Sequence, residues 1–444
     1  MVNDVIIVGG GIAGLTAAYF LSKKYNVTVI NESSIKIKTS STQMAQGGIA
    51  ATQNWESHIK DTLSAGGYKN NKKIVEIFCK EAWGAVEFLK NEIEVPFKKT
   101  PVLEGAHSEN RVWTTGDNTG DIIYKHLKEK CKNRKNISRI NGRALSILKN
   151  KENEVCGVLY ESNGDKKDLF SSYVIISTGG IGGLFEYSTN PENLKGDGIL
   201  MAYDANAKIE DLDNIQFHPT GLKSNDFPVF LLSEALRGEG ALIRNEKGER
   251  FLNHLPQKEL SARNIVVKEM LKQKECFLDL KDKSKKFWEG HFPNICKKLT
   301  EKNFDIEKNL IPIIPTEHFL CGGIKTNEFG ETTVKNLFAI GECASTGLHG
   351  INRLASNSLS EAVVFAKRCS EKICNFPKIK SQLVKDYKIC TKIIKRADLK
   401  TLKKIRTCMQ ENLKPESKNK KELKFCLEKI KDCFEKKIAL LFCL

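Results

Sequence analysis

The chain opens on DVIIVGGGIAG, residues 4–14, and this stretch decides the expected fold. Its first five residues form an apolar run of the length and branching that suit a buried parallel strand. Gly9, Gly11 and Gly14 follow in the spacing G-x-G-x-x-G, with an apolar helical pattern directly behind them. A second apolar run at 27–30 completes the strand, turn, helix and strand that this motif needs.

The chemistry of this motif predicts dinucleotide binding. The first glycine allows a tight turn, the second lets a pyrophosphate approach the backbone, and the third lets helix and strand pack closely. The helix N-terminus adds unpaired N–H groups and a partial positive charge. The residues expected to cradle the phosphates are Gly9, Gly10, Gly11, Ile12, Ala13 and Gly14.

The glycine loop alone does not decide which dinucleotide binds. Many such sites carry an acidic residue at the end of the second strand, where it holds a ribose hydroxyl. Here the strand ends in Asn31-Glu32. Glu32 stands at about the right distance or one place late, so a ribose contact and a solvated surface carboxylate are both open.

Composition predicts a multidomain protein of ordinary globular type. A chain of 444 residues has room for two or three domains. No window reaches the roughly 20 apolar residues of a membrane span, and the first apolar run is too short for a signal peptide. The 14 cysteines are scattered without a C-x-x-C pair. We therefore expect no metal site, no disulfide framework and a cytoplasmic location.

The net charge of +17 raises the question of nucleic-acid binding. Residues 376–444 hold 20 Lys and Arg against 8 Asp and Glu, so most of the excess lies in this region. Aromatic residues are sparse there, which disfavours a stacking platform for bases. Amphipathic helices with a solvated basic face are the favoured interpretation, and a field that steers an acidic substrate is a third. The apolar positions at helical spacing are Leu383, Tyr387, Ile393, Ile394, Leu402, Ile405, Met409 and Leu413.

The remaining patterns predict an α/β fold with an insertion. Helical patterns cover 74–89 and 122–131, and Ser356 begins another. Short strands are expected at 144–148, 155–160, 173–177 and 337–340. From Asn214 the character changes, with a hairpin expected around 245–248. We predict a Rossmann-like dinucleotide-binding domain in 1–213 and 317–375, an α+β capping domain in 214–316 and a C-terminal helical region in 376–444.

Five motifs in order point to a known family. They are the glycine loop, STQMAQGG at 41–48, FHPT at 217–220, AIGE at 339–342 and NRLASNSL at 352–359. Together they resemble the succinate dehydrogenase/fumarate reductase flavoprotein family over residues 4–375, most closely its branch that oxidises L-aspartate. The resemblance implies FAD as the cofactor.

The same resemblance implies which residues hold FAD. Asp197 and Glu342 match FAD contacts, and Ser358 and Leu359 match backbone that reaches the flavin ring at a helix N-terminus. Related succinate dehydrogenases attach their flavin to a histidine where this chain has Ser41, so FAD is expected to bind non-covalently. The segment expected to wrap the flavin is Ser41, Thr42, Gln43, Met44, Ala45, Gln46, Gly47 and Gly48.

Oxidation of a dicarboxylate needs cations for the carboxylates, a proton acceptor and a hydride acceptor. By resemblance, His218, His318 and Arg353 bind the carboxylates, and Arg353 suits a bidentate contact. Arg263 matches the family's proton-transfer residue. A structural histidine and a surface salt bridge are the alternatives for His218 and Arg263 taken alone.

The resemblance also implies a substrate. Ser233 and Glu234 match a further substrate-binding pair. Glu104 matches a glutamate that pairs with the ammonium of aspartate, and a surface-loop carboxylate is its alternative. The implied reaction is FAD-dependent oxidation of L-aspartate to iminoaspartate, with oxygen (giving hydrogen peroxide) or fumarate as acceptor. It is the first step of NAD synthesis from aspartate, with possible transfer of product to quinolinate synthase.

Two rival functions stay open at this point. A soluble fumarate reductase or succinate dehydrogenase flavoprotein would share most of the same residues. A basic, non-catalytic, nucleic-acid-associated protein would use the C-terminal region instead. We expect neither nucleic acid nor a membrane as a partner.

Overall fold

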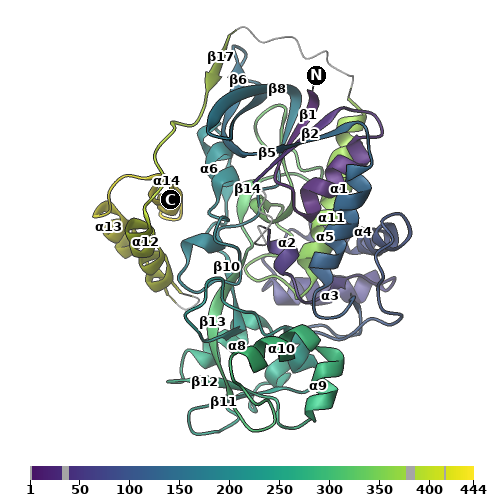
Figure 1. Ribbon diagram of the computed structural model, residues 1–444, viewed down its shortest axis with the longest axis vertical. Helices are drawn as coiled ribbons and strands as arrows, with labels where there is room; N and C mark the ends of the chain where they lie inside the picture. The colour runs from purple at the N-terminus through teal and green to yellow at the C-terminus, as the bar shows by residue number, and fades with distance from the viewer. Residues whose placement is uncertain (1–2, 33–39, 377–385, 415–416) are drawn as a thin grey trace.

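The computed structural model describes residues 3–32, 40–376, 386–414 and 417–444. Its largest sheet has the strand order β17-β6-β7-β8-β1-β2-β5, with β15 paired to β8 (Figure 1). The parallel part lies at one end, where β1 pairs with both β2 and β8. The strands of this part are β1 (Asn3–Val8), β2 (Val27–Asn31), β5 (Ile137–Asn141), β8 (Asp165–Ile176) and β15 (Leu337–Ala339). The Rossmann-like α/β class predicted from the sequence is confirmed.

The glycine turn joins β1 to α1 (Ile12–Leu21). Gly9 has a φ of +111°, a conformation that side-chain-bearing residues rarely adopt. A Cβ added at Gly14 would stand 2.0 Å from the Gly9 carbonyl oxygen, so only glycine lets the helix pack this closely on the strand. Helix α1 in turn packs against α5 (Thr119–Lys132) and α11 (Asn357–Cys374).

Two antiparallel strands and two helices complete the dinucleotide-binding part. Strands β6 (Arg143–Asn150) and β7 (Val155–Ser162) continue the sheet from β8 as an antiparallel meander. Helices α3 (Trp55–Ala65) and α4 (Lys72–Asn91) pack against each other, and α4 also packs on α11. The short elements are α2 (Ser41–Met44), β3 (Ile49–Ala50), β4 (Val112–Trp113), η1 (Gly182–Leu184), α6 (Asp197–Asp204), β9 (Ile209–Glu210), β14 (Gly323–Lys325), η3 (Gly341–Cys343) and β16 (Ala344–Ser345).

A separate four-stranded antiparallel sheet lies at the lower end of Figure 1. Its order is β10-β13-β12-β11, and its long strands β10 (Ile215–Leu222) and β13 (Ile311–Leu320) lead back toward the large sheet. We propose that this unit is the inserted capping domain. Its other elements are α7 (Glu234–Gly238), β11 (Leu242–Asn245), η2 (Lys258–Leu260), α8 (Arg263–Met270), β12 (Cys276–Asp279), α9 (Lys285–His291) and α10 (Pro293–Glu301).

The hairpin expected around 245–248 is wrong. The chain does turn there, because the N–H of Gly248 donates to the Asn245 carbonyl oxygen at 3.0 Å. However, β11 pairs with β12, about thirty residues further along, and Phe251 follows in turn conformation rather than in a strand. The apolar residues after the turn are used in the cap core, which includes Leu252, and so they do not form a ladder.

The C-terminal region is only partly helical as predicted. Leu402, Ile405 and Met409 are buried on one face of α12 (Leu399–Asn412), which packs with α13 (Lys420–Glu428) and α14 (Phe434–Leu441). Tyr387 instead lies in β17 (Tyr387–Ile389), an edge strand on β6. Ile393 and Ile394 lie in irregular chain, Leu413 begins β18 (Leu413–Lys414), which pairs with β19 (Ser417–Lys418), and Leu383 lies outside the described residues.

The helical spacing fails at Tyr387 because β6 offers an unpaired sheet edge, which the local pattern does not reveal. No helix in the described ranges is both long and apolar enough to cross a bilayer.

Candidate active site

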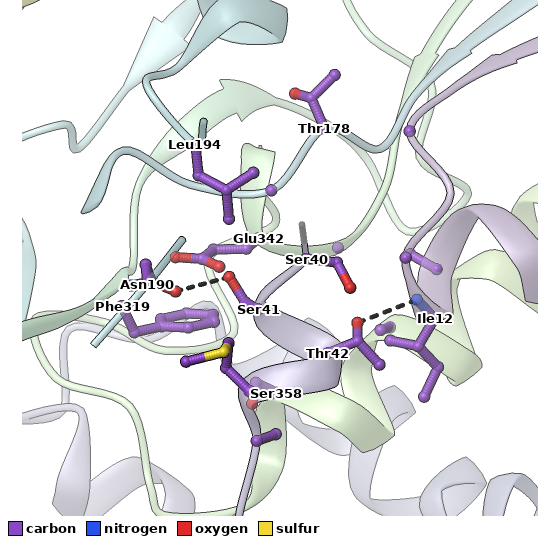
Figure 2. A pocket seen from close by; sticks show the side chains of 18 of the residues that line it. Ile12, Ser40, Ser41, Thr42, Thr178, Asn190, Leu194, Phe319, Glu342 and Ser358 are labelled. Atoms are coloured by element: carbon purple, nitrogen blue, oxygen red, sulfur yellow. Dashed lines mark hydrogen bonds between the residues drawn. The ribbon is translucent and has the colours of Figure 1, made fainter. Parts of the chain in front are cut away.

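One large cavity runs from the glycine turn to the capping sheet. It has an empty volume of about 1660 Å³, including its open mouth. Its lining contains every site residue predicted from the sequence except Gly14, which lies beneath the turn, and Gln43. Figure 2 shows Ser41, Thr42, Glu342 and Ser358 around one part of it, with Ile12 at the start of α1. Residues far apart in the sequence are thereby brought to one site.

The glycine end of the cavity presents backbone to a ligand. Gly9, Gly10 and Gly11 line it, and Gly11 caps α1 without any side-chain hydrogen bond. Thr42 Oγ1 accepts from the Ile12 N–H at 3.1 Å, which draws the 41–48 segment against the helix start (Figure 2). The absence of side chains at the turn leaves room for a phosphate near the positive end of the helix.

At the end of β2, Asn31 contacts the glycine turn and Glu32 lies at the cavity. Asn31 Oδ1 accepts from the Gly10 N–H at 3.0 Å, so Asn31 braces the turn. Glu32 lies at the cavity lining but is exposed to solvent. A ribose contact by Glu32 stays a prediction.

Two partly buried carboxyl groups in the cavity lining fit the hydroxyl-rich part of a dinucleotide. Burial raises the pKa of Glu342 to about 8, and the negative charge of Glu317 adds to the effect. Burial also raises the pKa of Asp197 to about 6, although Arg143 acts against it. Asp197 Oδ1 is buried and has no hydrogen-bond partner among the described residues. Such an oxygen is costly to leave unpaired, and a donor on a bound ligand would satisfy it.

Ser356 links the 41–48 segment to Glu104. Ser356 caps α11 in the left-handed conformation, with a φ of +59°. Its hydroxyl donates to Glu104 Oε2 at 2.6 Å and accepts from the Gly48 N–H at 3.3 Å. A non-glycine residue in this conformation is strained, and such strain concentrates at functional sites. Glu104 is thereby fixed beside the start of α11, next to Ser358.

A chain of charged groups runs from the cavity into the cap. Arg263, at the start of α8, donates from Nε to Glu234 Oε2 at 2.6 Å. The other oxygen of Glu234 lies 2.8 Å from Arg237 Nη2. Burial raises the pKa of Glu234, but Arg263 and then Arg237 outweigh it and lower this pKa to about 2. Glu234 is therefore an anion between two guanidinium groups, and Ser233 caps the same short helix.

Two histidines face each other across the paired strands β10 and β13. The rings of His218 and His318 lie 5.0 Å apart between centroids. Burial, and then the charge of Arg263, lower the pKa of both well below its usual range, so both rings are neutral. His218 Nδ1 accepts from the Thr220 N–H at 3.2 Å, which leaves the ring hydrogen on Nε2. That Nε2 is buried and has no partner among the described residues, so it is a donor without an acceptor.

Arg353 precedes α11 and packs against β13. Its guanidinium lies 4.5 Å from the centre of the Phe319 ring and donates to Ser358 Oγ at 3.2 Å. Burial, and then Arg263, lower the pKa of Arg353 to about 10, which still leaves it charged at neutral pH. Its Nε has no partner among the described residues. A buried cation of this kind needs an anion, and a substrate carboxylate provides one.

Gln216 connects the two arginines, and sequence reasoning did not single it out. Its amide nitrogen donates to Asn352 Oδ1 at 2.8 Å and to the Arg353 carbonyl oxygen at 2.7 Å. Its oxygen is then left for Arg263 Nη1 at 3.0 Å. Ser356 and Arg237 were also missed as individual residues, although Ser356 lies inside the quoted motif 352–359. The contact of Ser356 with Glu104 joins distant segments, and that of Arg237 with Glu234 lies within one short helix.

The comparisons with known proteins agree with this geometry. Residues 4–359 match the FAD binding domain family. The L-aspartate oxidase of Clostridium perfringens is 40% identical over 382 residues, which cover 83% of this chain and 85% of that protein. The chain belongs to the L-aspartate oxidase family of FAD-binding flavoproteins. The Bacillus subtilis L-aspartate oxidase is 38% identical over 392 residues, 84% of this chain and 72% of that protein.

A solved structure shows the same fold. An E. coli quinol fumarate reductase chain has a TM-score of 0.85 at 24% identity and covers 100% of this chain and 86% of that chain. The cofactor is FAD, as the sequence predicted. The glycine turn, the α1 N-terminus and the orphaned Asp197 oxygen all fit it.

The two glycines give a matched pair of tests. In G14A the new Cβ would stand 2.0 Å from the Gly9 carbonyl oxygen, so the FAD-free protein should lose about 1–3 kcal/mol of unfolding free energy. In G11A the nearest atom is Thr42 Oγ1 at 3.3 Å, so stability should change by less than about 0.5 kcal/mol. Because Gly11 faces the cavity, G11A should instead weaken FAD binding. Thermal unfolding and flavin-fluorescence titration separate the two effects; equal behaviour of the variants would contradict the assignment.

Proposed function

We propose that this protein oxidises L-aspartate to iminoaspartate, using FAD. The observation that carries the proposal is the placement of Glu104, a buried carboxyl at the edge of a cavity rich in arginine and histidine. Bound FAD would accept the hydride from the substrate and pass its electrons to oxygen or fumarate. The substrate's two carboxylates and its ammonium then need separate partners, and the cavity offers them.

The carboxylates would be held from two sides. Arg353 supplies a charge near α11, and its planar fork suits bidentate binding. His218 supplies a neutral N–H donor from the cap strands, and His318 lies beside it with its Nδ1 held by the Thr189 hydroxyl at 2.7 Å. Because His218 Nε2 has a hydrogen and no partner among the described residues, it can bond a carboxylate without displacing an existing contact. The substrate would thus be fixed at both ends, which orients its α-carbon toward the cofactor.

Proton removal would use the charged chain in the cap. Arg263 lies at the cavity, while Arg237 extends the chain through Glu234. An isolated guanidinium is a poor base because its pKa is so high. Arg263 can accept a proton from the substrate as it gives its Nε proton to Glu234 Oε2, so that Arg263 stays a cation and the proton ends on the Glu234 carboxylate. Gln216 keeps Arg263 pointed at the substrate side.

Glu104 would select aspartate over succinate. Burial, and then Glu234, raise the pKa of Glu104, while Ser356 acts against them. A bound ammonium would favour the ionised form and complete a charge-assisted hydrogen bond. Succinate has no such group and would leave Glu104 with the Ser356 hydroxyl but without a cationic partner.

The test compares the two substrates. Purified protein loaded with FAD should reduce the flavin with L-aspartate and should do so slowly or not at all with succinate. If succinate reduced the flavin and aspartate did not, a fumarate reductase or succinate dehydrogenase activity would replace the proposal. Salt-sensitive DNA binding without flavin reduction would favour the nucleic-acid alternative.

The variant E104Q sharpens this test. Glutamine keeps the size of the side chain but loses the charge, so kcat/KM for aspartate should fall about 10–100-fold. The value for succinate should not fall. The control is E109Q, which changes a nearby loop carboxylate that bonds Ser57 and Asn54 instead. Stopped-flow flavin reduction measures both; an equal loss with both substrates would refute selection by Glu104.

The position in metabolism is a proposal from family resemblance alone. We propose that the protein works in the cytoplasm and binds FAD non-covalently, and that its unstable imine product passes to quinolinate synthase. Release of all flavin on denaturation tests non-covalent binding. A coupled assay with that enzyme, with and without competing hydrolysis, tests direct transfer.

A further inference from the structure

The last C-terminal helix, α14, packs against α6, and residues at the start of α6 line the FAD cavity. In Figure 1, α14 lies beside α6, and the two helices are in contact. The turn before α6 contains Gly196, whose φ is +83°, and a Cβ added there would stand 3.0 Å from a methyl carbon of Ile438. Gly196 and Asp197 both line the cavity. Displacement of α14 would therefore reach the cofactor site directly.

Asp197 accepts hydrogen bonds from two arginines, one in the FAD-binding part and one in the C-terminal region. Its Oδ2 accepts from Arg143 Nε at 3.1 Å, and Arg143 belongs to β6 of the FAD-binding part. The same oxygen accepts from Arg396, which belongs to the C-terminal region. Both guanidinium groups bind Oδ2, so Oδ1 is left buried and without a partner among the described residues. Since Asp197 lines the cavity, Oδ1 is the atom left to receive a donor from FAD.

Arg396 is itself positioned by α14. Its Nη1 donates to Glu435 Oε1 at 3.0 Å, and its guanidinium lies 4.0 Å from the centre of the Phe434 ring. Glu435 is 1% exposed, and its second oxygen accepts from the Ala397 N–H at 2.9 Å. The position of Arg396 therefore depends on the first turn of the last helix.

The cluster around this contact carries an excess of positive charge. Two carboxylates, Asp197 and Glu435, face three cations, which are Arg143, Arg396 and Lys195. Lys195 precedes α6, lines the cavity and lies 3.7 Å from Glu435 Oε1. FAD carries a pyrophosphate, so the excess favours the loaded state.

We propose that Arg396 is a positioning residue for FAD, and that the C-terminal helices support the lining of the cofactor site from outside through its contact with Asp197. FAD binding and docking of these helices are then coupled, and the coupling is reciprocal. The proposal depends on FAD as the cofactor but not on aspartate as the substrate. It assigns the C-terminal region a role in holding the cofactor, in addition to the solvated basic face expected from sequence, to which the exposed Lys403, Lys404 and Lys421 belong.

The first test measures FAD affinity without any substrate. R396Q should raise the dissociation constant for FAD about tenfold, because Asp197 loses a charged partner. R396K should recover part of the affinity. The control is K437Q, which removes another contact of α14, the ion pair between Lys437 and Asp204 at 2.8 Å. Lys437 neither lines the cavity nor contacts Asp197, so K437Q should weaken FAD binding only through looser docking of α14, and by much less than R396Q does.

A double-mutant cycle shows whether Arg396 acts through Asp197. In a D197N background, R396Q should cause little additional loss of FAD affinity. Equal losses with and without D197N would overturn the coupling, as would wild-type affinity in R396Q. Loss of FAD in K437Q as large as in R396Q would reduce Arg396 to a general structural role.

Hydrogen exchange on the unmodified chain tests the same coupling and does not depend on the folding of a variant. FAD titration should slow exchange of the amides in Phe434–Leu441. Helix α9 of the capping unit serves as the internal reference. Unchanged exchange in α14 at saturating FAD would overturn the proposal, even if the protein oxidised aspartate. Slower exchange in a protein inactive toward aspartate would support it while the proposed function failed.

Discussion

R263Q should lower kcat for aspartate oxidation by about 10²–10⁴-fold, the range for loss of a positioned proton-transfer group. Arg263 is the only member of the charged chain in the cap that combines a bond to Glu234 with one to Gln216 among the described residues. Glutamine leaves Glu234 paired with Arg237, so the carboxylate keeps a cation and the cap should stay folded. Stopped-flow reduction of the bound flavin measures the chemical step directly.

The control for this variant is R244Q. Arg244 also pairs with a carboxylate of the cap, Asp279, but it does not line the cavity. R244Q should keep the wild-type kcat. Both variants should bind FAD normally, as read from the flavin absorbance. A loss of less than tenfold in R263Q would show that another group moves the proton.

R353M should raise KM for aspartate about a hundredfold, because a desolvated carboxylate would lose its charged partner. The guanidinium is stacked on Phe319 and bonded to Ser358, so methionine keeps much of the packing but none of the charge. R353K should recover only part of the affinity, since lysine cannot form two parallel bonds. Initial rates over a range of aspartate concentrations give KM and kcat separately.

A matched control lies on the far side of α11. Arg368 is also stacked on an aromatic ring, with its guanidinium 4.9 Å from the centre of Phe329, and it does not line the cavity. R368M should leave KM unchanged. If R353M changed kcat alone and left KM as it was, Arg353 would act in the reaction step and not in carboxylate binding.

The predictable parts of the fold are those specified by residues that lie close together in the sequence. The run before Gly9 and the apolar pattern behind it specify a strand, a turn and a helix within about twenty residues, and no distant partner is needed to read them. Where pairing is distant, the prediction failed. The partner of β11 follows about thirty residues later, and Tyr387 joins β6 across more than two hundred residues. Local pattern cannot report either contact.

The candidate site also has a part that the sequence predicts and a part that it does not. The resemblance places whole segments, and the candidate site residues taken from it line one cavity except Gly14 and Gln43, whereas their roles stay predictions. The supporting contacts were not predictable. The bond from Ser356 to Glu104 joins residues 252 apart, and that from Gln216 to Arg263 joins residues 47 apart. Arg396 is a further case, because its partner Asp197 lies in another part of the fold.

The pairing of β10 with β13 fixes the spacing between the groups proposed to bind the two carboxylates of the diacid. His218 and His318 sit on these two strands, and Arg353 is tied to the same pair, because its guanidinium stacks on Phe319 and its carbonyl oxygen accepts from Gln216. One strand pair therefore sets the spacing of both rings and the guanidinium. A substitution farther along β10 or β13 that changes their register would alter this spacing, and with it the selectivity for a four-carbon chain, without touching the substrate.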